Sequence, residues 1–115
     1  MNNSGPDTSL RIVPQPWPFS DPPDTAVFTT TQITRESKPI LFVSHDTDGS
    51  WQFHWGGRIN AAEAAVIGLS EVIASDPALV SLANLPLGWI AMRESESTPW
   101  VRSIAPEVTA EPTDA

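Results

Sequence analysis

Four residues that can ligate metals or transfer protons cluster in one short stretch: His45, Asp46, Asp48 and His54. Two imidazoles and a carboxylate can together hold a zinc ion, so this stretch is a candidate metal or acid–base site. If Asp48-Gly49 forms a two-residue turn, His45 and His54 lie diagonally on one face about 7 Å apart, while Asp46 points to the other face. A loop of three residues reverses the parity, and the two histidines then lie apart.

The ordinary alternative is a polar hairpin without a ligand. In that hairpin His54 lies on a solvated face, and Asp46 and Asp48 cap the turn through backbone hydrogen bonds. The spacing is generic, and the chain has no cysteine to complete a thiolate site. We therefore predict no metal and no cofactor, and we keep a metal-binding protein or hydrolase that uses His45 and His54 as the alternative function.

The stretch also begins like a calcium loop, with Asp46, Asp48 and Ser50 at alternate positions. Such a loop needs glycine at its sixth position and glutamate at its twelfth. Trp51 and Gly57 occupy those positions, so the calcium motif fails.

Motifs for covalent catalysis and nucleotide binding are incomplete as well. Ser44 precedes His45 without the glycine-flanked elbow of a serine hydrolase. Gly56-Gly57 lacks the further glycines and the lysine of a phosphate-binding loop. The sequence therefore predicts no catalytic residue.

A β-hairpin must position these residues, and it is the clearest structural signal in the chain. Strand-like runs at residues 40–44 and 50–55 flank Asp48-Gly49, where glycine accepts the backbone angles of a tight turn. With a two-residue turn, Phe42 faces Trp55, and one face of the hairpin becomes a core of large apolar side chains: Ile40, Phe42, Trp51, Phe53 and Trp55.

The remaining elements predict an α+β fold, with an antiparallel sheet of four to five strands and two short helices on one face. Composition and periodicity favour strands at residues 26–34, 87–92 and 100–102, and helices at residues 71–75 and 78–83. Residues 60–68 fit a helix or a strand equally well.

Proline content predicts the domain boundaries. Residues 1–25 form a proline-rich arm that we expect to be flexible, with Trp17 and Phe19 packing back on the domain. Residues 26–103 form a single globular domain, and residues 104–115 form an acidic, disordered tail.

The charge balance restricts the partners of the protein. The chain has 115 residues, 14 acidic and 6 basic, and its formal net charge is −8. Such an acidic chain is not expected to bind nucleic acid, and no apolar run is long enough for a membrane span. The first 25 residues lack the apolar core of a signal peptide, so we expect a cytoplasmic protein.

Trp100 lies beside Pro99 and near Arg102, where an exposed aromatic ring can anchor an interface.

Several short motifs between residues 38 and 103 resemble a group of small bacterial proteins of unknown function. They are Val43-Ser44-His45-Asp46, Gly49-Ser50-Trp51-Gln52-Phe53, Asp76-Pro77 and Leu85-Pro86-x-Gly88-Trp89. The layout is also loosely similar to immunity-type proteins of bacterial toxin systems. The resemblance implies a bacterial, cytoplasmic α+β protein, and it brings no known catalytic residue.

These observations together predict a protein that binds another protein without catalysis. A basic partner is favoured by the net charge, since complementary charge accelerates association, and immunity-like neutralisation is one form of this function. The binding residues expected from the sequence are Trp100, Arg102, His45, Asp46, Asp48 and His54.

Overall fold

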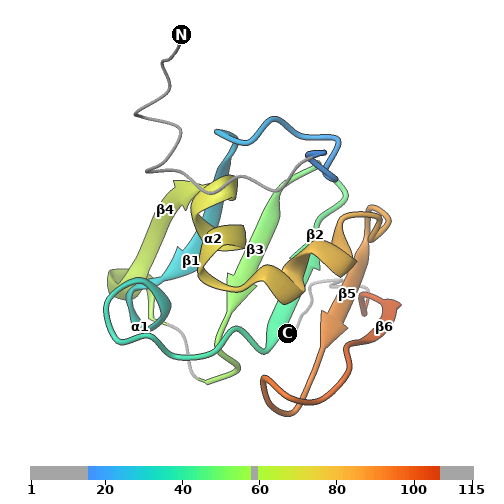
Figure 1. The fold of residues 1–115 in the computed structure, drawn as a ribbon. Coiled ribbons are helices and arrows are strands. Elements are labelled where there is room, and N and C mark those ends of the chain that lie inside the picture. Colours follow the sequence, from blue (N-terminus) through green and yellow to red (C-terminus); the bar gives the residue numbers. More distant parts are fainter. Residues whose placement is uncertain (1–15, 58–59, 107–115) are drawn as a thin grey trace, which may run out of the picture.

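A six-stranded β-sheet forms one layer of the domain and short helices form the other (Figure 1). This computed structural model describes residues 16–57 and 60–106. The predicted α+β class is confirmed, and two of the short helical elements lie on one face of the sheet.

The sheet has more strands than expected, and it is mixed. The strands are β1 (Ala26–Thr30), β2 (Phe42–His45), β3 (Trp51–His54), β4 (Ala64–Gly68), β5 (Trp89–Met92) and β6 (Val101–Ile104). Their order across the sheet is β4-β1-β3-β2-β5-β6, and β1 runs parallel to β3 while all other neighbours are antiparallel. The prediction of four to five antiparallel strands is therefore wrong in this detail, because β1 joins the far side of the hairpin in the same direction as β3.

The helical layer consists of α2 (Leu69–Ser75) and η3 (Pro77–Leu82), which lie across the same face of the sheet (Figure 1). Apolar residues in α2 recur at helical spacing, so one side of the helix faces the sheet: Leu69, Val72 and Ile73 are buried. Asp76 caps η3, since its Oδ1 accepts a hydrogen bond from the Ala78 N–H at 3.1 Å, and Pro77 fits the first helical position.

The core lies between these two layers. Its buried apolar residues are Phe19, Val27, Ile40, Val43, Trp51, Phe53, Leu69, Val72, Ile73, Leu79, Leu82, Leu85 and Ala91. Phe19 belongs to the stretch predicted as a flexible arm, yet it is 6% exposed, and its ring packs edge-on against Trp51 at 5.4 Å. Trp17 also packs on the core, so residues 16–25 are part of the domain. Residues 1–15 of the predicted arm lie outside the described residues.

Three local predictions need correction. The predicted strand at residues 26–34 ends at Thr30, and the helical turn α1 (Thr31–Thr34) follows. The ambiguous residues 60–68 contain both structures, a turn η2 (Ala61–Glu63) and then strand β4. The final strand extends to Ile104, inside the predicted tail, and residues 107–115 lie outside the described residues.

The second face of the sheet is covered by no helix of the described chain (Figure 1). We call it the open face, and its side chains come from alternate positions of the six strands: Phe28, Phe42, Ser44, Gln52, His54, Val66, Ile90, Met92, Val101 and Ser103. The hairpin places the candidate polar residues on or beside this face.

Candidate functional site

The β2–β3 hairpin has a three-residue loop, Thr47-Asp48-Gly49. The Asp46 N–H donates to the Ser50 carbonyl at 2.8 Å, and the Gly49 N–H donates to the Asp46 carbonyl at 2.9 Å. Gly49 has φ +93°, as the third position of such a loop requires. The two-residue register is therefore wrong, and the structure has the alternative in which the parity is reversed.

This register separates the two histidines. His45 pairs with Trp51 and faces the helical layer, where its ring stacks on Trp51 at 3.9 Å and its Nδ1 lies 2.7 Å from the Leu85 carbonyl oxygen. His54 pairs with Phe42 on the open face. The two imidazoles therefore cannot share one metal ion, and the described residues include no group of three or more His, Cys, Asp or Glu that could hold one.

The same register brings Asp46 and His54 onto one face, which the two-residue turn had excluded. Gln52 connects them, because its Nε2 donates to Asp46 Oδ2 at 2.7 Å and its Oε1 lies 2.9 Å from His54 Nε2. The Ser44 hydroxyl also donates to Asp46. Four side chains thus form one hydrogen-bonded chain along the open face, which we call the polar chain: Ser44, Asp46, Gln52 and His54.

The polar chain fixes the state of His54. The Gln52 side-chain nitrogen donates to Asp46, and its oxygen faces His54 Nε2. Because an amide oxygen can only accept a hydrogen bond, His54 Nε2 carries the proton. The other nitrogen, Nδ1, is buried and has no hydrogen-bond partner among residues 16–57 and 60–106. Burial lowers the pKa of His54 below its ordinary 6.5, and Asp46 opposes this shift only in part. A neutral histidine is therefore favoured on the open face.

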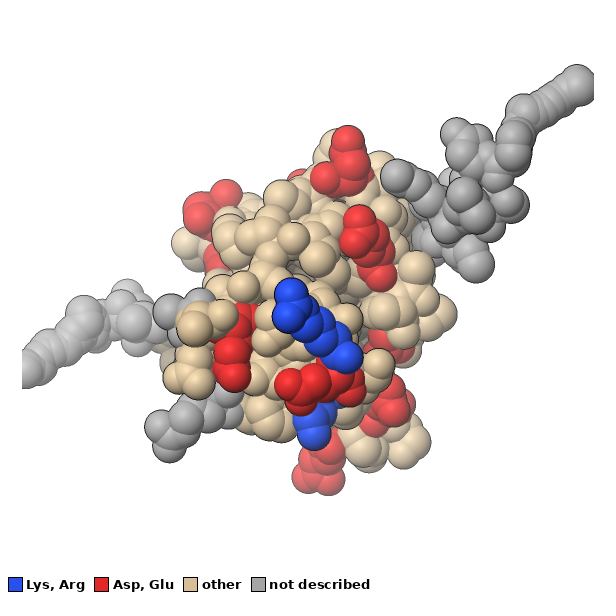
Figure 2. Space-filling model, turned by 90° about the vertical axis from the view of Figure 1, so that its left-hand side faces the viewer, with Lys and Arg blue, Asp and Glu red and all other residues tan. Residues whose placement is uncertain are grey.

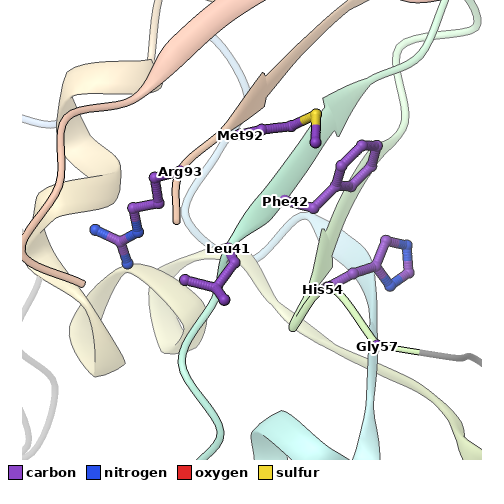
Figure 3. Close-up of a pocket in the computed structure, with 7 residues that line it drawn as sticks. Leu41, Phe42, His54, Gly57, Met92 and Arg93 are labelled. Carbon is purple, nitrogen blue, oxygen red and sulfur yellow. The ribbon is translucent and has the colours of Figure 1, made fainter. Parts of the chain in front are cut away.

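A hollow of about 410 Å³ lies next to His54. Figure 3 shows Phe42, His54 and Met92 projecting to the same side of the sheet from three neighbouring strands, while Leu41 and Arg93 project to the other side. A second hollow of about 460 Å³ lies on the other side of Met92, where Val101 and Pro99 contribute to its walls. Met92 therefore stands between two mostly apolar depressions.

Exposed apolar side chains surround the polar chain on the open face. The exposed fractions are 46% for Phe28, 58% for Val66, 50% for Met92 and 67% for Val101. Phe28 faces Val66 on β4 and Gln52 on β3, so it lies directly beside the polar chain. Apolar residues of this size that are exposed together on a sheet mark an interaction surface more often than isolated ones do.

The open face carries no charged side chain on its strands, and Asp46 lies at its hairpin end. The rest of the molecule is acidic. Figure 2, which views the β4 side, shows Asp and Glu side chains in several separate places and Lys and Arg in one small group. The open face is thus a neutral area on a negatively charged protein.

The other predicted binding residues have structural roles. Trp100 is half-buried, and the Arg93 guanidinium lies over its ring at 4.2 Å. Trp100 is therefore not the exposed interface anchor that was predicted near Arg102. Arg102 faces the helical layer and donates to Asn84 Oδ1 at 2.8 Å and to the Ser81 carbonyl at 2.5 Å. Asp48 caps the hairpin loop, because the Ser50 N–H donates to its Oδ1 at 2.9 Å, and this bond lowers its pKa.

The sequence reasoning missed the residues that make the open face distinctive. Phe28 and Val66 alternate with buried Val27 and half-buried Ile67, which is a signal for one covered and one uncovered face. Gln52 was noted only as a polar position, and its bridging role depends on the register of the hairpin. The arrangement offers an apolar surface around polar groups that bond one another, and it suits binding better than covalent chemistry, since the Ser44 hydroxyl is engaged by Asp46.

Comparison of the chain with protein-family models, with curated proteins and with solved structures finds no match. In the described part of the chain, every helix is too short or too polar to cross a lipid bilayer.

Proposed function

We propose that this protein acts by binding another protein, without catalysis, through the open face. The observation that carries the proposal is a sheet face left without a helical cover, on which Phe28, Val66, Met92 and Val101 are each about half or more exposed. Removing apolar area of this kind from water is favourable by about 25 cal/mol for each Å², and this gain opposes the entropy cost of association.

Met92 is the expected centre of the contact. It stands between the two hollows, which together can receive large side chains from a partner on both sides of it. Interfaces concentrate their binding energy in a few such central, fully desolvated contacts. Gln52 is half-buried beside this centre, and the second N–H of its amide can give the contact directional hydrogen bonding and specificity.

A basic partner fits the charge of the protein. The net charge of −8 attracts positively charged proteins over a distance, and the neutral open face then forms the apolar contact. Immunity-like neutralisation of a basic toxin is one function of this type, and the similarity of layout noted from the sequence supports it.

The test compares tagged variants as baits in lysates of the source cells. Val101→Glu places a carboxylate in the apolar area on the edge strand β6, directly opposite Met92 on β5, and we expect it to lose the partner that the wild-type chain captures. Ala78→Glu adds the same charge at an exposed position of η3, and we expect it to capture the partner as the wild-type chain does. Equal capture by both variants would contradict the open face as the binding surface.

A further inference from the structure

We propose that in the free protein a second copy of the chain covers the open face, so that the protein masks its own binding surface until a partner displaces that copy. This inference rests on the proposed function, because it assigns a second occupant to the same surface. Three features of the open face support it: its charge, its pattern of polar and apolar residues, and its size.

The charge of the protein restricts where two copies can meet. Each copy carries a net charge of −8, so most pairings place carboxylates opposite carboxylates. On the helical side, Glu71 is exposed. The β4 side displays several acidic side chains (Figure 2). The strands of the open face carry no charged side chain, and Asp46 lies at its hairpin end, so this face lets two copies form an apolar contact with few opposing charges.

The pattern of the open face is self-complementary, as a two-fold interface requires. Phe28 and Val66 form an apolar area at the β4 side, and Met92 and Val101 form another at the β6 side. The polar chain runs between them. A two-fold axis that lies in the plane between the stacked sheets and perpendicular to the strands therefore sets apolar areas against apolar areas. The hairpin end of one polar chain, with Asp46, then faces the opposite end of the other.

The size of the open face predicts a weak dimer. Six strands about 4.8 Å apart, each about four residues long, give a face of roughly 400 Å². Two copies therefore bury about 800 Å² of projected area, which is below the range of tight complexes. We expect a dissociation constant of about 10 µM or weaker, and such a dimer can yield to a partner of higher affinity.

Sedimentation velocity on the purified full-length chain, from about 5 µM to about 500 µM, tests the dimer. We expect the mass to rise from 12.4 kDa toward twice that value as the concentration increases. Val101→Glu and Val101→Lys should both remain monomeric, and Ala78→Glu should associate like the wild-type chain. Val101→Lys makes the net negative charge smaller and so weakens the repulsion between copies. If this variant also fails to associate, the cause is the lost apolar contact and not a general effect of charge.

Salt gives a second readout in the same experiment. Two copies of equal charge repel each other, and salt screens that repulsion. We therefore expect the dimer to become tighter between about 50 mM and about 500 mM salt, whereas complexes with a basic partner become weaker. A dimer that dissociates in high salt would show that charged contacts hold it, and would overturn the pairing through the neutral face.

The outcomes separate this inference from the proposed function. A wild-type chain that stays monomeric at all concentrations overturns the inference, and the capture experiment with Val101→Glu then still tests the function. A dimer that survives both Val101 substitutions, in variants whose circular dichroism spectra match the wild-type spectrum, also overturns it. A dimer lost in both variants supports the inference even if partner capture does not depend on Val101.

Discussion

Gln52 determines the chemistry that is open to His54. Its amide bonds Asp46 on one side and His54 on the other, which places the histidine proton on Nε2 and leaves Nδ1 as a buried acceptor. Because the ring is desolvated, its neutral form is favoured. His54 therefore acts as a neutral polar contact on the open face and not as a positive charge.

The lowered pKa of His54 predicts a dependence of stability on pH. In the unfolded chain His54 binds a proton below about pH 6.5, whereas the folded chain binds it only at lower pH. The free energy of unfolding should therefore fall as the pH decreases below about 6.5, and this contribution should be fully present above that pH. Urea unfolding of the wild-type chain and His54→Gln between about pH 8 and about pH 5 measures the effect.

We expect the variant to lose part of the decline between about pH 6.5 and about pH 5, since glutamine does not titrate. The carboxylates contribute mainly at lower pH in both proteins. Identical slopes for the two proteins in this interval would contradict the assigned state of His54.

The buried contacts of Arg93 predict that its substitution lowers the free energy of unfolding more than substitution of the exposed Arg102 does. Its guanidinium is almost completely buried, pairs with Asp76 at 2.5 Å, donates to the Ile40 carbonyl at 3.0 Å and lies over Trp100. Arg93→Met leaves Asp76 without its partner, and we expect a loss of about 3 kcal/mol in the free energy of unfolding. Arg102→Met removes an exposed guanidinium and should cost less than about 1 kcal/mol. Equal losses in urea unfolding would mean that the Arg93 contacts do not stabilise the fold.

Among the elements, the β2–β3 hairpin shows how far local sequence predicts this fold. Asp48-Gly49 between two strand-like runs located the hairpin correctly, and Asp76-Pro77 located the start of η3. The loop length could not be read from the residues, because Asp-Gly fits both a two-residue turn and a three-residue loop. A difference of one residue in the register exchanged the faces of the β2 side chains relative to β3, and so Phe42 moved from the predicted core to the open face.

The arrangement of the strands depends on contacts that are distant in the sequence. The parallel pairing of β1 with β3 and the antiparallel pairing of β1 with β4 leave no local signal in the residues of β1. Trp100 was predicted to be exposed because of its polar neighbours. It is half-buried because Arg93, which lies seven positions earlier on the adjoining strand end, covers its ring. Of the binding residues expected from the sequence, Asp46 and His54 lie in the polar chain, and the apolar residues of the open face depend on the tertiary structure.

Substitutions at Gly49 test the geometry of the three-residue loop, which sets the register of the hairpin. Its φ of +93° favours glycine, and a Cβ at this position would meet no atom within 4 Å. The cost of a substitution there comes from the backbone alone, so Gly49→Val should lose about 1–2 kcal/mol in the free energy of unfolding. Gly49→Asn should lose less, since asparagine adopts this conformation more easily. A similar loss for both variants would indicate that the loop has a different geometry.

For the whole molecule, the contrast between an acidic surface and a neutral, apolar sheet face supports the proposed function. The acidic surface keeps copies and other acidic proteins apart, and the open face is the area where close contact costs least. Sheets that lack a helical layer on one face ordinarily place polar residues there, whereas this one retains Phe28, Val66, Met92 and Val101. Under the proposed function the acidic surface would select a basic partner over a distance, and the open face would form the contact.

Site-specific photo-crosslinking tests the central claim, that the open face is the contact surface, most directly. The chain has no cysteine, so single cysteines at Val66, Val101 or Ala78 can each be labelled with a benzophenone without a background. In a lysate of the source cells we expect adducts, to a partner or to a second copy, from the Val66 and Val101 probes and none from the Ala78 probe on η3. Adducts from the Ala78 probe alone, or equal yields from all three positions, would contradict it.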